Sequence, residues 1–434
     1  PARSGGEELT ATDLLLYGAD RAEADLVEQP KAQAAVLAAI GDALVRQDLH
    51  DRAAPLIESA LATSRRLADA PAVHRLMTIQ CQIARRNKDF DKAKALATEL
   101  VALVQAAEVE DPAAQANAFF ELGRAQYALL ENDAAEQSFR RSLAFQRIRN
   151  PPRPDSLVRA LGSLAGVLRR QGKIELAEEA AREELTVVQR IHTDDNPLVA
   201  SALHRLALIL VDLDQLEEAQ ALLEEAAAMK RRLYGDDSLS LASSVNNLGH
   251  LALLRGDLEL AEGHFLEALE LRRRRSGEGG LGQVSMLANL GRVAQLKGQY
   301  GVGESFLRQA IGIRSSHLGP TSSGTLQYQT YLAGLLVAKG QIAAASGLVL
   351  EILTQLESTG DSGSRPWFAA LAEAVQVACE IERARLKGAE ARLSAALDEL
   401  RMSRGPRSFE VRQVEGYLER LGQRQGTSVQ GSGG

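Results

Sequence analysis

The feature that most constrains the fold of this chain is an internal repeat with a period close to 42 residues. A small residue recurs at Ala53, Ala93, Ala135, Ala177, Ala219, Ala261, Gly303 and Ala345, and in most cases a larger apolar residue follows four positions later. The first step is 40 residues and every later step is 42. So constant a period is typical of an array in which each repeat is one supersecondary unit. The sequence therefore predicts eight repeats.

Each repeat is expected to contain two amphipathic helices. Twelve residues before the small residue lies an apolar–small pair, as in Leu206-Ala207. Leu203 and Leu210 extend this pair to the spacing i, i+3, i+4, i+7, which places all four side chains on one helical face. Aromatic residues make up only 4% of the chain, and Ala and Leu dominate the rest, which favours helices over sheets. Because one helix pair cannot bury its apolar face alone, we expect an all-α protein in which the pairs stack as an α-solenoid.

Residues that end or interrupt helices also recur with the period of the repeat. Gly172, Asp214, Gly256, Gly298 and Gly340 lie at steps of 42, where the first helix of each repeat needs a left-handed residue to end. Pro30, Pro71, Pro112, Pro154 and Pro197 lie between repeats.

The segment DDSLSLASSVNNLGHLALLRGDLELAEGHFLEALELRRR resembles the tetratricopeptide repeat in its 42-residue form, as found in kinesin light chains. It departs from that family at the first aromatic positions, where this chain mostly has aliphatic residues. The resemblance implies a right-handed superhelix of helix pairs. We expect a capping segment at 1–30, eight repeats at 31–357, a degenerate helix pair with a capping helix at 358–422, and a disordered tail at 423–434.

The segment LTATDLLLYGADRAEADLVEQPKAQAAVLAAIGDAL resembles the start of the repeat region in many bacterial serine/threonine protein kinases. No kinase motif follows it. The chain begins at Pro1 rather than Met, so we expect a fragment, namely the non-catalytic region of such a kinase. A free-standing adaptor that binds peptide cargo is the alternative. Both a cytoplasmic and an extracytoplasmic location remain open.

Several other classes of function find little support in the sequence. A net charge of -7 argues against nucleic acid, and no apolar run is long enough to cross a membrane. Cys81 and Cys379 lie in distant repeats and are expected to be unpaired core residues. No catalytic arrangement or phosphate cradle is present, so we expect no enzyme activity, no cofactor and no metal. A metal pair between His204 and His250 is a minor alternative.

Two motifs are assigned to the scaffold. Gly277 to Gly282 matches a dinucleotide fingerprint, but it follows an expected helix rather than a strand, so we interpret it as a linker between repeats. Arg272 to Arg275 would lie at the end of that helix, where cations interact favourably with the helix dipole.

The resemblance to tetratricopeptide arrays implies that the first helices line a concave groove through the face opposite their core stripe. The predicted peptide-binding residues on that face are Asn117, Arg124, Arg159, Arg169, His204, Arg205, Asn246, Asn247, His250, Asn289, Arg292 and Gln295, and the same count adds Glu121 in repeat 3 and Arg75 and Arg85 in repeat 2. In repeats 3 to 7 this face holds five Arg and one Glu, a net charge of +4 on an acidic chain.

That charge predicts a protein or peptide partner with an acidic or phosphorylated segment, bound mainly between repeats 2 and 7. Arg can donate two parallel hydrogen bonds to a carboxylate or phosphate. Asn can bond both groups of a peptide backbone, and the resemblance to kinesin light chains implies this role for Asn247 and Asn289.

Overall fold

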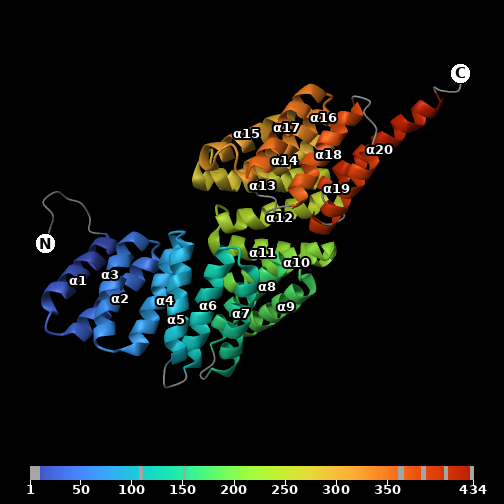
Figure 1. Ribbon diagram of the computed structural model, residues 1–434. Helices are drawn as coiled ribbons and strands as arrows, with labels where there is room; N and C mark the ends of the chain where they lie inside the picture. The colour runs from blue at the N-terminus through green and yellow to red at the C-terminus, as the bar shows by residue number, and fades with distance from the viewer. Residues whose placement is uncertain are drawn as a thin grey trace. The chain divides into compact units, whose positions relative to one another are not determined.

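The computed structural model describes residues 10–106, 111–149, 153–359, 366–382, 388–404 and 409–430, and within them all regular structure is helical (Figure 1). The chain divides into two compact bodies, Pro1–Thr193 and Asp194–Gly434, here called the N-terminal and C-terminal bodies. In both bodies, successive helices pack against one another as stacked pairs. The predicted all-α solenoid is confirmed.

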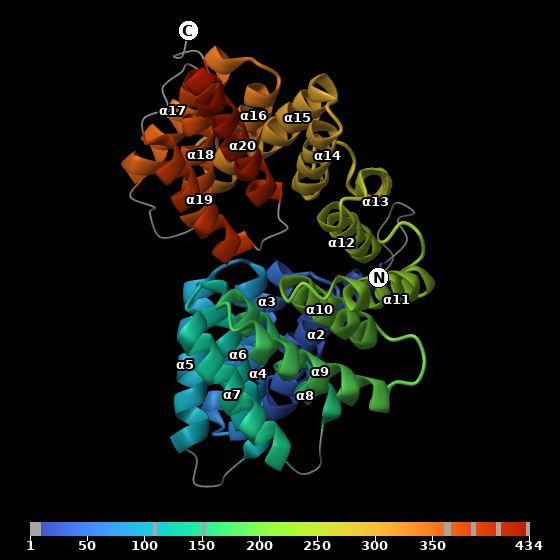
Figure 2. The same ribbon diagram turned by 90° about the vertical axis from the view of Figure 1, so that its right-hand side faces the viewer.

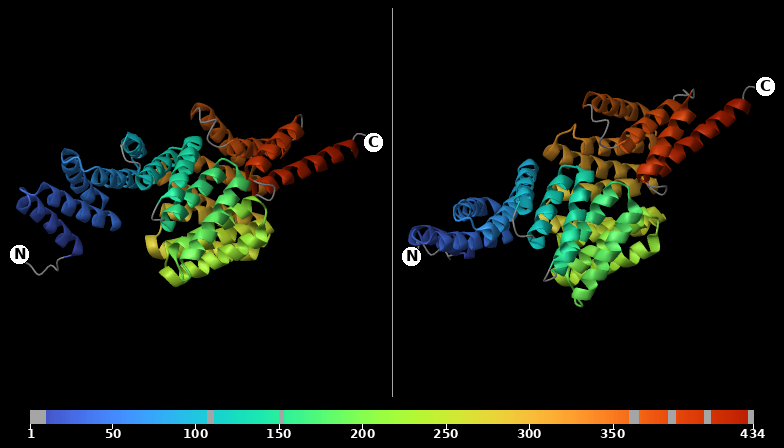
Figure 3. Two further views of the ribbon diagram at one scale, coloured as in Figure 1. Left: turned by 90° about the horizontal axis from the view of Figure 1, so that it is seen from below. Right: turned by 60° about the horizontal axis from the view of Figure 1, so that its bottom comes forward.

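The N-terminal body holds one leading helix and repeats 1 to 4. Its helices are α1 (Ala11–Asp25), α2 (Pro30–Arg46), α3 (His50–Arg66), α4 (Ala70–Arg86), α5 (Phe90–Ala106), α6 (Pro112–Ala128), α7 (Asn132–Ile148), α8 (Pro154–Arg170) and α9 (Ile174–Ile191). Figure 3 shows them following one another in chain order, from blue to green. Thr10 and Asp13 form a capping box that begins α1.

The C-terminal body holds repeats 5 to 8, one further helix pair and a last helix. Its helices are α10 (Pro197–Asp212), α11 (Leu216–Tyr234), α12 (Leu239–Arg255), α13 (Leu258–Ser276), the 3-10 turn η1 (Leu281–Gln283), α14 (Val284–Leu296), α15 (Tyr300–Leu318), α16 (Ser323–Ala338), α17 (Ile342–Thr359), α18 (Pro366–Glu382), α19 (Ala389–Arg404) and α20 (Phe409–Gln430). The last helix lies against α18 and α19 (Figure 2).

The periodic small residues let the two helices of a repeat approach closely. Every periodic Ala from Ala53 to Ala345 is at most 1% exposed. At the partner position on the first helix, a Cβ added to Gly249 would lie 2.8 Å from the ring of Phe265. The same atom on Gly123 would lie 2.7 Å from the ring of Phe139. A larger residue at either glycine would therefore force the helices apart.

The turns inside the repeats share one backbone conformation. The predicted left-handed residues Gly172, Asp214, Gly256, Gly298 and Gly340 all have positive φ. Asp48, Lys88 and Leu130 hold the same position in repeats 1 to 3, and they too have positive φ, between 60° and 65°. Each of the five predicted Pro residues lies in the first turn of the first helix of its repeat, where the missing N–H costs no hydrogen bond.

The C-terminal end differs from expectation. We expected a disordered tail from residue 423, but α20 continues to Gln430. Residues 431–434 of that tail, and Pro1 at the other end, lie outside the described part of the chain.

Two features of the scaffold bear on the expectations above. Gly277 to Gly282 connects α13 to α14, and no helix of the described residues is long and apolar enough to cross a membrane. Cys81 and Cys379 are buried free thiols, and burial raises the pKa of the Cys81 thiol to about 12.

Candidate functional site

The N-terminal body gathers arginines on its first helices, α4, α6 and α8. Arg85 and Arg124 are half-buried, and Arg159 is exposed. None of the three forms an ion pair within 4 Å among the residues that the structure describes. The guanidinium of Arg124 lies 5.6 Å from the centre of the Phe120 ring, so an aromatic face accompanies its charge.

These side chains lie close enough to repel one another. Burial lowers the pKa of Arg85 to about 10, and the neighbouring charge of Arg124 adds to the effect. Burial also lowers the pKa of Arg124, which is further lowered by Arg86 and Arg159. We call Arg85, Arg86, Arg124 and Arg159 the arginine cluster.

One carboxylate lies next to the arginine cluster. Glu121 on α6 is 4% exposed, and its Oε1 accepts a hydrogen bond of 3.1 Å from Gln82 Nε2. Its charge opposes the lowering of the pKa of both Arg85 and Arg124. Four cations and one anion leave this surface with a formal charge of +3. A low local dielectric strengthens the attraction of this positively charged surface for a second anion.

Two other predicted residues of this body lie on α6 and α8. Asn117 is exposed on α6, and Arg169 is half-buried in the last turn of α8. The adjacent Arg170 packs its guanidinium 3.4 Å from the centre of the Tyr127 ring and donates to the Tyr127 carbonyl over 2.7 Å. The spacing of residues in the sequence predicted that Arg85 lies on this face. It did not predict Arg86, because the count along the helix assigned that residue to no face.

In the C-terminal body, the predicted groove residues belong to hydrogen-bond networks. His204 Nε2 accepts from Asn247 Nδ2 at 3.1 Å, which assigns the ring proton to Nδ1. That nitrogen lies 3.1 Å from Ser244 Oγ, which also accepts from the buried Lys230 Nζ at 2.8 Å. Burial lowers the pKa of Lys230 to about 8.

These bonds occupy both ring nitrogens of His204, and no group of three potential metal ligands is found within the described ranges. The arrangement therefore favours a polar surface over the metal pair with His250. His250 and Arg205 are both half-buried on this body's first helices. Gln295 on α14 is half-buried, and its Oε1 has no hydrogen-bond partner.

Arg292 departs from the predicted role. It was expected to attract the charge of a partner, but it is 4% exposed and its Nη2 lies 3.5 Å from Glu410 Oε2 on α20. Asn289 Oδ1 accepts from Arg292 Nη1 at 3.3 Å, and Asn289 Nδ2 donates to Asn246 at 3.5 Å. The periodicity could not reveal this pairing, because Glu410 lies more than a hundred residues away in sequence.

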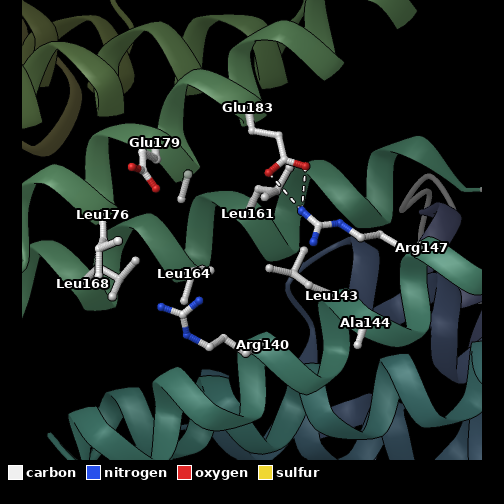
Figure 4. Close-up of a pocket in the computed structure, with 11 residues that line it drawn as sticks. Arg140, Leu143, Ala144, Arg147, Leu161, Leu164, Leu168, Leu176, Glu179 and Glu183 are labelled. Atoms are coloured by element: carbon white, nitrogen blue, oxygen red, sulfur yellow. Dashed lines mark hydrogen bonds and ion pairs between the residues drawn. The ribbon is translucent and has the colours of Figure 1, made fainter.

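A small cleft lies on the other side of the N-terminal body, between the second helices α7 and α9 (Figure 4). Its volume is about 250 Å³. Leu161, Leu164 and Leu168 of α8 contribute apolar side chains. Arg147 Nη2 donates to both carboxylate oxygens of Glu183, at 2.8 and 3.0 Å. Both arginines of the cleft thus already have carboxylate partners, Arg147 with Glu183 and Arg140 with Glu136, unlike Arg85, Arg124 and Arg159.

Comparison with known proteins identifies the repeat. The family model described as tetratricopeptide repeat matches residues 156–232 and 198–274. No curated protein matches the chain.

Solved structures share the fold at low identity. The apo form of the quorum sensor NprR from B. thuringiensis is 11% identical with a TM-score of 0.63, over 90% of this chain and 100% of that one. Rap protein complexed with competence and sporulation factor is 15% identical with a TM-score of 0.55, over 91% and 99%. BtubC from P. vanneervenii is 24% identical with a TM-score of 0.47, over 53% of this chain and 92% of that one. The chain thus contains tetratricopeptide repeats that stack as an α-solenoid.

Proposed function

We propose that this chain is a non-catalytic protein-interaction region, and that it binds an acidic or phosphorylated segment of a partner protein on the arginine cluster. The observation that carries the proposal is the excess of positive charge on α4, α6 and α8. Glu121 is the carboxylate whose charge acts on both Arg85 and Arg124, while the charges of neighbouring arginines act against it. The whole chain, in contrast, carries a net charge of -7.

The chemistry of the cluster favours a carboxylate or phosphate ligand. Guanidinium groups can donate two hydrogen bonds at once to either anion. An incoming anion would also relieve the mutual repulsion that now opposes the charged form of Arg85 and Arg124. Ligand binding should therefore be strongest for a multiply charged segment.

Structures of similar fold lend general support. Rap protein was solved in complex with competence and sporulation factor, and NprR is named a quorum sensor. At such low identity they support only the idea that a solenoid of this kind can hold another molecule.

We further propose that the region belongs to a bacterial serine/threonine kinase. The support is the N-terminal resemblance described above, which covers α1 and α2. The coding sequence upstream of Pro1 tests this directly: a kinase domain is expected there, whereas its absence would favour the free-standing adaptor.

The binding proposal can be tested with the full chain and a fluorescent probe peptide that carries three phosphoserines. We expect the unphosphorylated peptide to bind at least tenfold more weakly. Replacing Arg85, Arg124 and Arg159 by Gln should lower the affinity for the phosphopeptide ten- to a hundredfold, because each contact contributes about 0.5–0.9 kcal/mol.

A matched control separates the cluster from general charge. Replacing Arg52, Arg66 and Arg190 by Gln removes the same charge from exposed positions on second helices. This control should leave affinity nearly unchanged. Equal losses in the two triple variants would show that net charge alone attracts the probe, and no loss in either would refute the site.

A further inference from the structure

The first turns of α20 contact three first helices of the C-terminal body. Arg412 Nη2 donates to the Leu253 carbonyl of α12 at 2.8 Å. Glu410 pairs with Arg292 of α14 and accepts a hydrogen bond of 2.5 Å from the hydroxyl of Tyr331 on α16. One helix of the chain thus lies on the surface where the sequence predicted a bound partner. We call the surface around Leu253, Arg292 and Tyr331 the C-terminal face.

Two different sets of residues hold α20 in place. Val411, Val414, Tyr417 and Leu421 are at most 2% exposed and form the apolar stripe of a helix that packs against α18 and α19. Glu410 and Arg412 make the polar contacts to the C-terminal face, whereas Gln413 Nε2 donates to the Tyr417 hydroxyl of the same helix over 3.0 Å. A helix that only closed the end of the solenoid would need the apolar stripe alone.

The C-terminal face is built to receive a carboxylate. The side chain of Arg292 is 5% exposed, and that of Glu410 is fully buried. Arg292 donates a hydrogen bond to Asn289 on the same helix, and its guanidinium lies 5.2 Å from the centre of the Tyr331 ring. A buried guanidinium without an anion would be strongly unfavourable, so the face requires a carboxylate from some helix.

A glycine of α16 lies beside a side chain of α20. A Cβ on Gly334 would lie 2.0 Å from Gln413 Nε2, so the missing side chain leaves room for the Gln413 amide in its present position. Gly334 lies inside α16, where the helix itself gives no reason for glycine.

The fit of α20 is incomplete. Among the residues that the structure describes, Arg412 Nε and Gln413 Oε1 are buried without hydrogen-bond partners. Burial lowers the pKa of Arg412, and the nearby charge of Arg292 lowers it further. The carboxylate of Glu410 pairs with Arg292, and the charge of Arg412 is opposed by both Glu410 and Glu415. A helix with a carboxylate at this position and no cation two residues later would bind with less repulsion than α20 does.

We propose that the C-terminal face is a second binding site, which takes a partner helix that presents a carboxylate in its first turn, and that α20 occupies this site as an intramolecular ligand. Binding of the partner releases the first turns of α20. The site is separate from the arginine cluster, so either assignment can fail without the other.

The test uses the full chain with Glu410→Gln, which keeps the shape of the side chain and removes its charge. The control is Glu419→Gln on the same helix, where Glu419 is exposed. Hydrogen exchange should accelerate at least tenfold in residues 410–417 of Glu410→Gln and stay near wild type in Glu419→Gln. Exchange in α10 and α11 should be unchanged in both, which confirms that the body remains folded.

The probe for the emptied site is a synthetic peptide of residues 408–424 with Arg412→Gln. It should bind Glu410→Gln at least tenfold more tightly than wild type, and the same peptide with Glu410→Gln should bind neither. Should Glu410→Gln fail to fold, Tyr331→Phe removes one hydrogen bond and should show the same changes at about threefold. Unchanged exchange in α20, or faster exchange without tighter peptide binding, would overturn the proposal.

Discussion

At the scale of single residues, the period predicted which positions pack and which positions turn. The small residues and the left-handed glycines could be found because each has one physical reason to be there. Lys88 and Leu130 escaped notice, because nothing in a Lys or Leu signals a positive φ. The stacking of neighbouring helices imposes the turn on whichever residue occupies the position.

Leu130 offers a direct test of that imposed strain. Its φ is 65°, so its backbone is in a strained conformation. Its side chain is 69% exposed, so burial of the side chain does not compensate for this strain. Leu130→Gly should stabilise the N-terminal body by about 0.5–1 kcal/mol, since relief of left-handed strain exceeds the entropy cost of glycine. Urea unfolding measures this difference. Gly172→Leu at the equivalent position should destabilise by a similar amount, and a stabilising Gly172→Leu would contradict the account.

Lys230 gives a prediction for pH. Its pKa is about 8 in the folded chain, below the ordinary value of about 10.4 for an unfolded one. Below pH 8 the folded state must hold a buried charge. Between pH 8 and 10.4 the unfolded state binds more protons, so this penalty disappears as pH rises.

Lys230→Met should therefore be more stable than wild type by about 1–3 kcal/mol at pH 7, with the gain shrinking toward zero at pH 10. Denaturant unfolding of both proteins at the two pH values measures the difference. If Lys230→Met were more stable than wild type by the same amount at both pH values, packing rather than charge would determine the difference in stability.

At the scale of elements, the helix pairs could be predicted from the sequence, because the apolar stripe of each helix marks the face that packs against neighbouring helices. The role of α20 could not be predicted in this way. Its apolar stripe predicted a cap, but its contact with Arg292 and Tyr331 depends on residues far away in sequence. Periodicity contains no information on which distant side chains meet.

The glycines of repeats 7 and 8 predict how stability varies along the C-terminal body. Gly301, Gly312 and Gly347 lie in α15 and α17 with no atom within 4 Å of an added Cβ, so each costs roughly 0.5–1 kcal/mol relative to Ala. We expect α15 and α17 to exchange amide hydrogens faster than α10 and α11, because an array can open locally. Changing the three glycines to Ala should slow that exchange, and equal protection in both regions of the wild type would contradict the prediction.

At the scale of the whole molecule, charge is distributed unevenly on an acidic chain. Surface ion pairs such as Arg147–Glu183 and Arg231–Glu267 link neighbouring second helices, so the charges on those helices already have partners. Arg292 is paired with Glu410. The arginine cluster, in contrast, keeps an excess of positive charge, which is why the account places partner binding on first helices.

The most direct test of that claim is to map where the phosphoserine probe binds the full chain. Hydrogen exchange with and without the probe reports on every helix of the N-terminal body at once. The account predicts slower exchange in α4, α6 and α8 on probe binding, with α7 and α9 unchanged. Slower exchange in α7 and α9, around the cleft between Arg140 and Glu183, would contradict it.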